Sequence, residues 1–177
     1  MVEPWLRGTL TDVEPVRRAV LHALELAEED VLRWTADWDE DALEMEPLGL
    51  PSVAFQMRHI ARSIDRLLTY AAGSSLSDAQ MTALQTEHVA GASGEKLRRQ
   101  VVEAIAAVRP FALRFAQAEL HEPRTVGRAG LPTTLAGLLI HIAEHTQRHV
   151  GQLITTAKIL RTVLDALRGR ASHNNPG

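Results

Sequence analysis

Residues 138–153 read LLIHIAEHTQRHVGQL and carry three histidines, His141, His145 and His149, at intervals of four residues. Side chains four positions apart are neighbours on one face of an α-helix, about 6 Å apart at the surface. Apolar residues of the segment recur at helical spacing on the side that holds His145 and His149. The segment is therefore predicted to be an amphipathic helix that turns these two histidines toward the protein interior.

The pair His145 and His149 is a candidate site for a divalent metal ion, because the spacing H-x-x-x-H lets two helical imidazoles converge on one ion. Buried imidazoles need partners, and a pair of hydrogen-bonded interior histidines is the alternative interpretation. His141 is expected to support a ligand or face the substrate rather than bind the metal. Gln152, three residues after His149, is expected to hydrogen-bond a ligand or substrate, or else to be an interior amide.

Apolar residues at spacings of three and four predict three more helices ahead of this one. The four helices are expected over residues 12–35, 52–72, 94–118 and 133–167. A long connection, residues 73–93, separates the second helix from the third and has room for one short helical turn after Ser77. Without an alternating strand pattern, the chain is predicted to be an all-α four-helix bundle with a long connection between helices 2 and 3. We expect one domain over residues 1–168 and a disordered tail over residues 169–177.

Polar residues mark the expected helix boundaries. Asp12, Ser52 and Ser93 are typical N-cap residues and stand at the starts of the first three helices. The acidic segment 36–49 and the segment 119–132, which holds two prolines and two glycines, are both expected to be loops.

Composition restricts the classes of function that the chain can have. The 177 residues include no cysteine, which excludes disulfides, thiolate zinc sites and a cysteine nucleophile within the chain. A formal net charge of −3 gives no electrostatic footprint for nucleic acid. No signal peptide is visible, and no stretch approaches the roughly 18 apolar residues of a membrane span. We therefore expect a cytoplasmic protein whose partners include neither nucleic acid nor a membrane.

The second expected helix offers a third candidate ligand in His59, which lies beside the apolar stripe in residues 57–62, MRHIAR. Bundles build metal sites from side chains on facing helices. Taken alone, His59 is more typical of a hydrogen-bonded histidine in a core or at its boundary than of a metal ligand. The remaining histidines are expected to be exposed: His22, His88, His121 and His173.

A histidine in the second helix, followed much later by H-x-x-x-H-x-x-Q in the last helix, resembles the DinB-like (DinB/YfiT) metalloenzyme superfamily. The matching pieces are residues 57–62 and residues 141–152, HIAEHTQRHVGQ, and the resemblance spans roughly residues 10–168. It implies a four-helix bundle, often a homodimer, with a three-histidine site for zinc, nickel or a similar ion. The ligands that it implies are His59, His145 and His149.

Relatives of known activity in this superfamily use low-molecular-weight thiols, as mycothiol-dependent maleylpyruvate isomerase and bacillithiol or glutathione S-transferase-like enzymes do. The first hypothesis is therefore a metal-dependent thiol transferase or thiol-assisted isomerase that acts on a small-molecule substrate. A metal-dependent hydrolase and a non-catalytic, metal-stabilised stress or interaction protein are the alternatives. Arg148 and Val150 depart from the histidine and arginine that many members carry at these positions.

Overall fold

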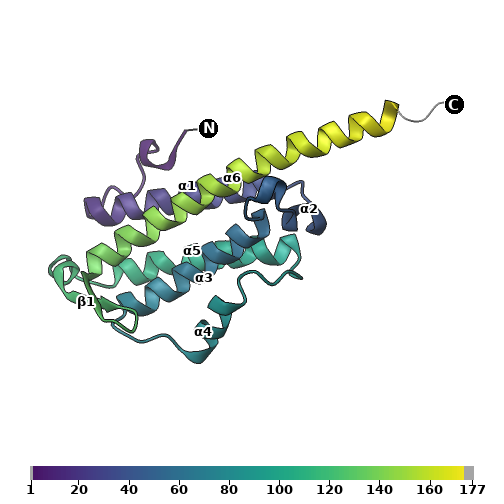
Figure 1. Ribbon diagram of the computed structural model, residues 1–177. Helices are drawn as coiled ribbons and strands as arrows, with labels where there is room; N and C mark the ends of the chain where they lie inside the picture. The colour runs from purple at the N-terminus through teal and green to yellow at the C-terminus, as the bar shows by residue number, and fades with distance from the viewer. Residues whose placement is uncertain (1, 174–177) are drawn as a thin grey trace.

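Four long helices make up most of the protein and pack side by side (Figure 1). The computed structural model describes residues 2–173 of the chain. The long helices are α1 (Pro15–Thr35), α3 (Val53–Ala71), α5 (Gly94–Leu113) and α6 (Leu135–His173). Helices α1 and α3 each pack against both α5 and α6, and the four enclose one apolar core. The prediction of a mostly helical protein is confirmed.

The core is built from the apolar stripes of the four long helices. Each stripe repeats every three or four residues and so lines one side of its helix. Fully or almost fully buried members include Leu24, Val31, Met57, Ile60, Ile64, Val101, Val108, Leu139, Ile142 and Leu153. Because α3 and α6 contribute stripes to the same core, residues next to those stripes on the two helices are brought face to face.

Capping residues fix where the long helices begin. The Ser52 hydroxyl accepts the N–H of Phe55 at 3.0 Å at the start of α3, and Ser93 caps α5 in the same way. Helix α1 starts later than predicted, because Glu14 rather than Asp12 is its N-cap. The carboxylate of Glu14 accepts two first-turn N–H groups, and Pro15 fits the first helical position because it has no N–H to satisfy.

A small β-hairpin precedes α6, in a segment that the sequence predicts to be a loop. Strands β1 (Pro123–Val126) and β2 (Leu131–Thr134) pair antiparallel, with the first residue of each opposite the last residue of the other. Gly127 and Gly130 adopt positive φ in the turn between them. The prediction of a purely all-α fold is wrong here. Strands of four residues that each contain a proline show too little alternation to be recognised.

The connections also contain short helices. Helix α4 (Asp78–Gln85) follows Ser77, where the sequence predicts a helical turn, and a capping box formed by Ser77 and Gln80 starts it. Helix α2 (Glu40–Glu44) lies in a predicted loop, where the Asp39 side chain caps an acidic turn.

Short 3₁₀ turns complete the chain at η1 (Pro4–Leu6), η2 (Pro47–Gly49) and η3 (Gln117–His121). Helix α5 ends at Leu113, five residues before its predicted end, and contains Pro110 in its last turn.

Helix α6 is the longest element and extends beyond the other helices toward the C-terminus (Figure 1). It continues to His173 and so includes residues 169–173, which the sequence predicts to be disordered. Each residue added to an existing helix gains a hydrogen bond without a new nucleation cost, and no proline interrupts the chain there. Residues 174–177 of that predicted tail lie outside the described residues. Within residues 2–173, none of the helices has the length and apolar content needed to span a bilayer.

Candidate metal centre

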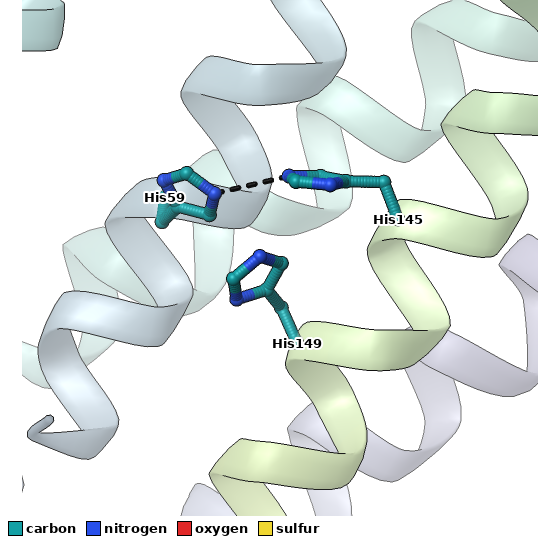
Figure 2. A group of neighbouring side chains, drawn as sticks. All are labelled: His59, His145 and His149. Carbon is teal, nitrogen blue, oxygen red and sulfur yellow. Dashed lines mark hydrogen bonds between the residues drawn. The ribbon is translucent and has the colours of Figure 1, made fainter. Parts of the chain in front are cut away.

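Three histidines meet in the space between α3 and α6 (Figure 2). One nitrogen from each of His59, His145 and His149 lies within 4.8 Å of the others, and all three side chains are half-buried. The Nε2 atoms of His59 and His145 are 3.0 Å apart. The ring of His149 lies 4.2 Å from that of His59 and 4.5 Å from that of His145, measured between centroids. The three residues form a group that can hold a metal ion.

The core positions these rings. On α6, His145 and His149 are one helical turn apart and follow the buried Ile142 along the same side of the helix. On α3, His59 directly precedes Ile60, which is fully buried. The packing of α3 on α6 therefore brings together histidines that are 86 residues apart in the sequence.

Hydrogen bonds determine which nitrogen of two rings faces the cluster. The Nδ1 atom of His59 lies 2.7 Å from Oε2 of Glu87, and Nδ1 of His149 lies 2.7 Å from Oε1 of Gln56. A carboxylate and an amide oxygen only accept, so both Nδ1 atoms carry the proton and donate. The Nε2 atoms are then unprotonated, with lone pairs available to a metal.

The donor set fits a divalent transition-metal ion, with zinc as the reference for its geometry. Two ring nitrogens bound to one zinc ion at about 2.0–2.1 Å lie about 3.3 Å apart in tetrahedral geometry. The 3.0 Å separation between Nε2 of His59 and Nε2 of His145 is close to that value. Three neutral imidazoles also leave at least one coordination position open, which is the pattern of catalytic zinc sites.

Protonation favours ligation at neutral pH. Burial, followed by the charge of neighbouring histidines and Arg148, lowers the pKa of His145 from 6.5 to about 4. Burial, with His59 and Arg148, likewise lowers the pKa of His149 to about 4. Burial of Glu87 works to raise its pKa, but hydrogen bonds from His59 and Arg66 outweigh it and hold the pKa below its usual value. The two α6 histidines are therefore neutral, and Glu87 is ionised, at pH 7.

The family model of the DinB superfamily matches residues 13–153. The chain belongs to the DinB superfamily. A crystal structure described as that of a conserved protein from Enterococcus faecalis has the same fold, with a TM-score of 0.69 at 17% identity. That match covers 85% of this chain and 99% of the other. No curated protein sequence matches the chain.

Two further residues predicted for the site flank the cluster in this DinB-superfamily chain. His141 lies one turn before His145, with ring centroids 5.4 Å apart, and its Nδ1 is 3.6 Å from Oε2 of Glu144. It is not part of the group that can hold a metal. Gln152 is exposed and lines the groove described below, three residues after His149. Their roles stay predictions.

The expectation for the other histidines is wrong at His22. That side chain is buried, and its Nε2 lies 3.1 Å from the hydroxyl of Thr9, because the N-terminal segment folds back over α1. Arg7 holds the segment there through ion pairs with Glu25 and Glu29. His88 is exposed as expected and stacks on the ring of Phe55.

Sequence reasoning misses the two acceptors that orient the rings. Gln56 stands three residues before His59, and the helical spacing carries a signal that both belong to one face of α3. Glu87 lies in the connection after α4, where no periodic pattern indicates which way its side chain turns. Only the folding of that connection back onto α3 reveals the contact.

A groove of about 380 Å³ opens beside the cluster, between α6 and the chain that leads into α3. Gln56 lines it and also contacts His149, so it connects the groove to the three histidines. The remaining lining residues are Leu50, Pro51, Arg148, Gly151, Gln152, Thr155 and Thr156. The three histidines do not line the groove themselves, and Gln56 links them to a space large enough for a small molecule.

Proposed function

We propose that this chain is a metal-dependent enzyme that binds one zinc or nickel ion through Nε2 of His59, His145 and His149. The proposed reaction is thiol transfer or thiol-assisted isomerisation, with a low-molecular-weight thiol and a small electrophilic substrate. The observation that carries the proposal is the convergence of the three histidines, two of them with Nδ1 held by acceptors. A divalent ion bound there would lower the pKa of a thiol or water and supply a nucleophile at neutral pH.

The residues of the chain supply orientation and access. Glu87 and Gln56 hold two of the three rings so that their nitrogens already face one point, which reduces the reorganisation needed on binding. The three histidines are half-buried rather than sealed in the core. An accessible site of this kind favours catalysis over a purely structural ion, which is normally fully enclosed by protein ligands.

The groove beside His149 is the proposed place for the substrate. Arg148 and Gln152 offer hydrogen-bond donors there that suit a carboxylate or carbonyl oxygen. The space at Gly151 is open, since a Cβ at this position would meet no atom within 4 Å. Apolar contacts from Leu50 and Pro51 favour a ligand with an apolar portion.

Elemental analysis of protein isolated without chelators tests the metal, and a screen of small thiols with electrophilic acceptors tests the reaction. We expect one ion per chain and thiol consumption that depends on it, with both lost in His145→Ala. A chain without stoichiometric metal, or a His145→Ala variant that behaves like wild type, contradicts the proposal. Turnover without thiol identifies a hydrolase instead, and bound metal without any turnover identifies a stabilising ion.

A further inference from the structure

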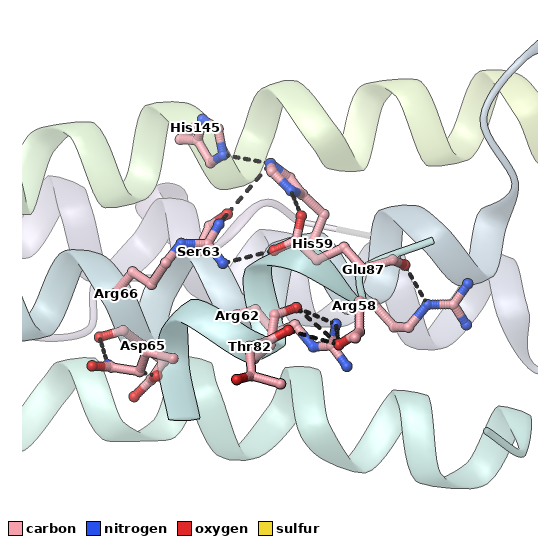
Figure 3. Close-up of polar contacts among 12 residues, drawn as sticks. Arg58, His59, Arg62, Ser63, Asp65, Arg66, Thr82, Glu87 and His145 are labelled. Carbon is pink, nitrogen blue, oxygen red and sulfur yellow. Dashed lines mark hydrogen bonds and ion pairs between the residues drawn. The ribbon is translucent and has the colours of Figure 1, made fainter. Parts of the chain in front are cut away.

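Glu87 is a buried carboxylate that joins two side chains of α3 (Figure 3). Its side chain is 5% exposed. One oxygen lies 2.7 Å from Nδ1 of His59, and the other accepts from Nη1 of Arg66 at 2.7 Å. Arg66 also donates to the hydroxyl of Ser63, which lies 3.3 Å from Nε2 of His59. A charged group is therefore held against the ring of one candidate ligand.

A row of arginines on α3 holds the segment that carries Glu87. Arg58 donates through Nε to the backbone carbonyl of Glu87 at 2.8 Å. Arg62, one turn further, donates to the carbonyl of Ala83 at 2.6 Å. Both terminal nitrogens of Arg58 bind the carboxylate of Glu44, at 2.6 and 2.9 Å, which fixes the guanidinium in place. The position of Glu87 is thus set by contacts that run from α2 to α4.

We infer that Glu87 is a positioning residue for the metal centre, and that it couples the α4 segment, residues 77–93, to occupancy of that centre. The inference rests on the proposed metal site. By accepting a hydrogen bond from Nδ1–H, the carboxylate fixes the tautomer and orientation of His59 and makes Nε2 a stronger electron-pair donor to the metal. It also places one negative charge beside three neutral ligands. If Glu87 served only to form an ion pair, its contact with Arg66 would be enough and the contact with His59 would have no role.

Three variants separate these roles. Glu87→Gln removes the charge facing His59, and Glu29→Gln is the matched control because it removes a carboxylate partner of Arg7, outside the contacts that hold Glu87. Arg66→Gln removes the other partner of Glu87 and leaves its contact with His59. The measurement is the dissociation constant for Zn²⁺ by chelator competition, together with the visible spectrum of the Co²⁺ form. We expect Glu87→Gln to weaken binding about 10–100-fold and to change the spectrum, and both controls to stay within about threefold of wild type.

Hydrogen exchange in the wild-type chain tests the coupling and needs no variant to fold. Zn²⁺ should slow exchange of backbone amides in residues 77–93 of the wild type, and this protection should be absent in Glu87→Gln. Equal affinities in Glu87→Gln and Glu29→Gln, or unchanged exchange over residues 77–93 in the Zn²⁺-bound wild type, overturn the inference alone. A wild-type chain that binds no Zn²⁺ overturns the proposed function with it.

Discussion

His59, His145 and His149 differ in how firmly they are held. Glu87 accepts a hydrogen bond from His59, and Gln56 accepts one from His149. Among the described residues, the hydrogen-bond partner of His145 is the ring of His59. Two ligands are thus oriented before any ion arrives, and the third gains its main polar partner from the ion. A preorganised pair with one adaptable member lowers the entropic cost of binding while leaving the centre room to adjust.

The cluster predicts a sharp difference between His141 and its neighbours. His149→Ala and His59→Ala should each lose stoichiometric metal, because two imidazoles are too few for a tight site. His141→Ala should retain the metal, because His141 lies outside the group that can hold an ion. Metal content after gel filtration measures this. Loss of the ion from His141→Ala at the level of His149→Ala would place His141 among the ligands.

Protonation predicts how the stability of the metal-free protein depends on pH. The pKa values of His145 and His149 are lowered to about 4, from 6.5 in the unfolded chain. Between pH 6.5 and 4, the unfolded chain binds protons that the folded chain does not, so stability falls as the pH falls. The melting temperature in the presence of a chelator should decrease from pH 7 to pH 5. The same decrease in a His145→Ala/His149→Ala double variant would show that other groups cause it.

At the scale of the elements, helix α3 carries the candidate ligand His59, the residue Gln56 that accepts from His149, and the arginines that hold the Glu87 segment. The N-terminal cap of α3 therefore matters to the whole site. Ser52 caps the helix through the N–H of Phe55. Ser52→Ala should lower the free energy of unfolding by about 1 kcal/mol, measured by urea denaturation. Ser75→Ala, at an exposed position in the connection after α3, is the control and should change it by less than about 0.5 kcal/mol. Equal effects would mean that the cap contributes nothing specific.

The elements also show how far sequence reasoning reaches. The long helices, the caps Ser52 and Ser93, and the short helix after Ser77 follow from periodicity and local side-chain chemistry. The hairpin before α6 and the short α2 do not, because their few residues carry no complete period. The three histidines were predicted through spacing and a family resemblance. Glu87 was not, because its contact with His59 depends on how a connection folds back in three dimensions.

At the scale of the whole molecule, an ion at the cluster would cross-link α3 and α6 through the middle of the fold. A ligand that binds only the folded state at a concentration 100 times its dissociation constant adds about 2.7 kcal/mol of stability. For a chain of this size, we expect chelation to lower the melting temperature by roughly 5–10 °C. Differential scanning calorimetry measures the shift, and His145→Ala should show none. An equal shift in that variant would point to metal bound elsewhere.

A homodimer, a cytoplasmic location and the absence of nucleic-acid partners stay predictions. The fold itself narrows the function less than the site does, since one fold hosts many chemistries. The proposed function therefore depends on the three histidines and on what they bind.

Diffraction from crystals of the Zn²⁺-loaded protein, collected on both sides of the zinc absorption edge, tests most directly whether the three histidines bind one metal ion. We expect one anomalous peak per chain, bonded to Nε2 of His59, His145 and His149, with Nδ1 of His59 still on Glu87. An anomalous map without a peak between these three residues, or a zinc ion held by other side chains, would contradict the account.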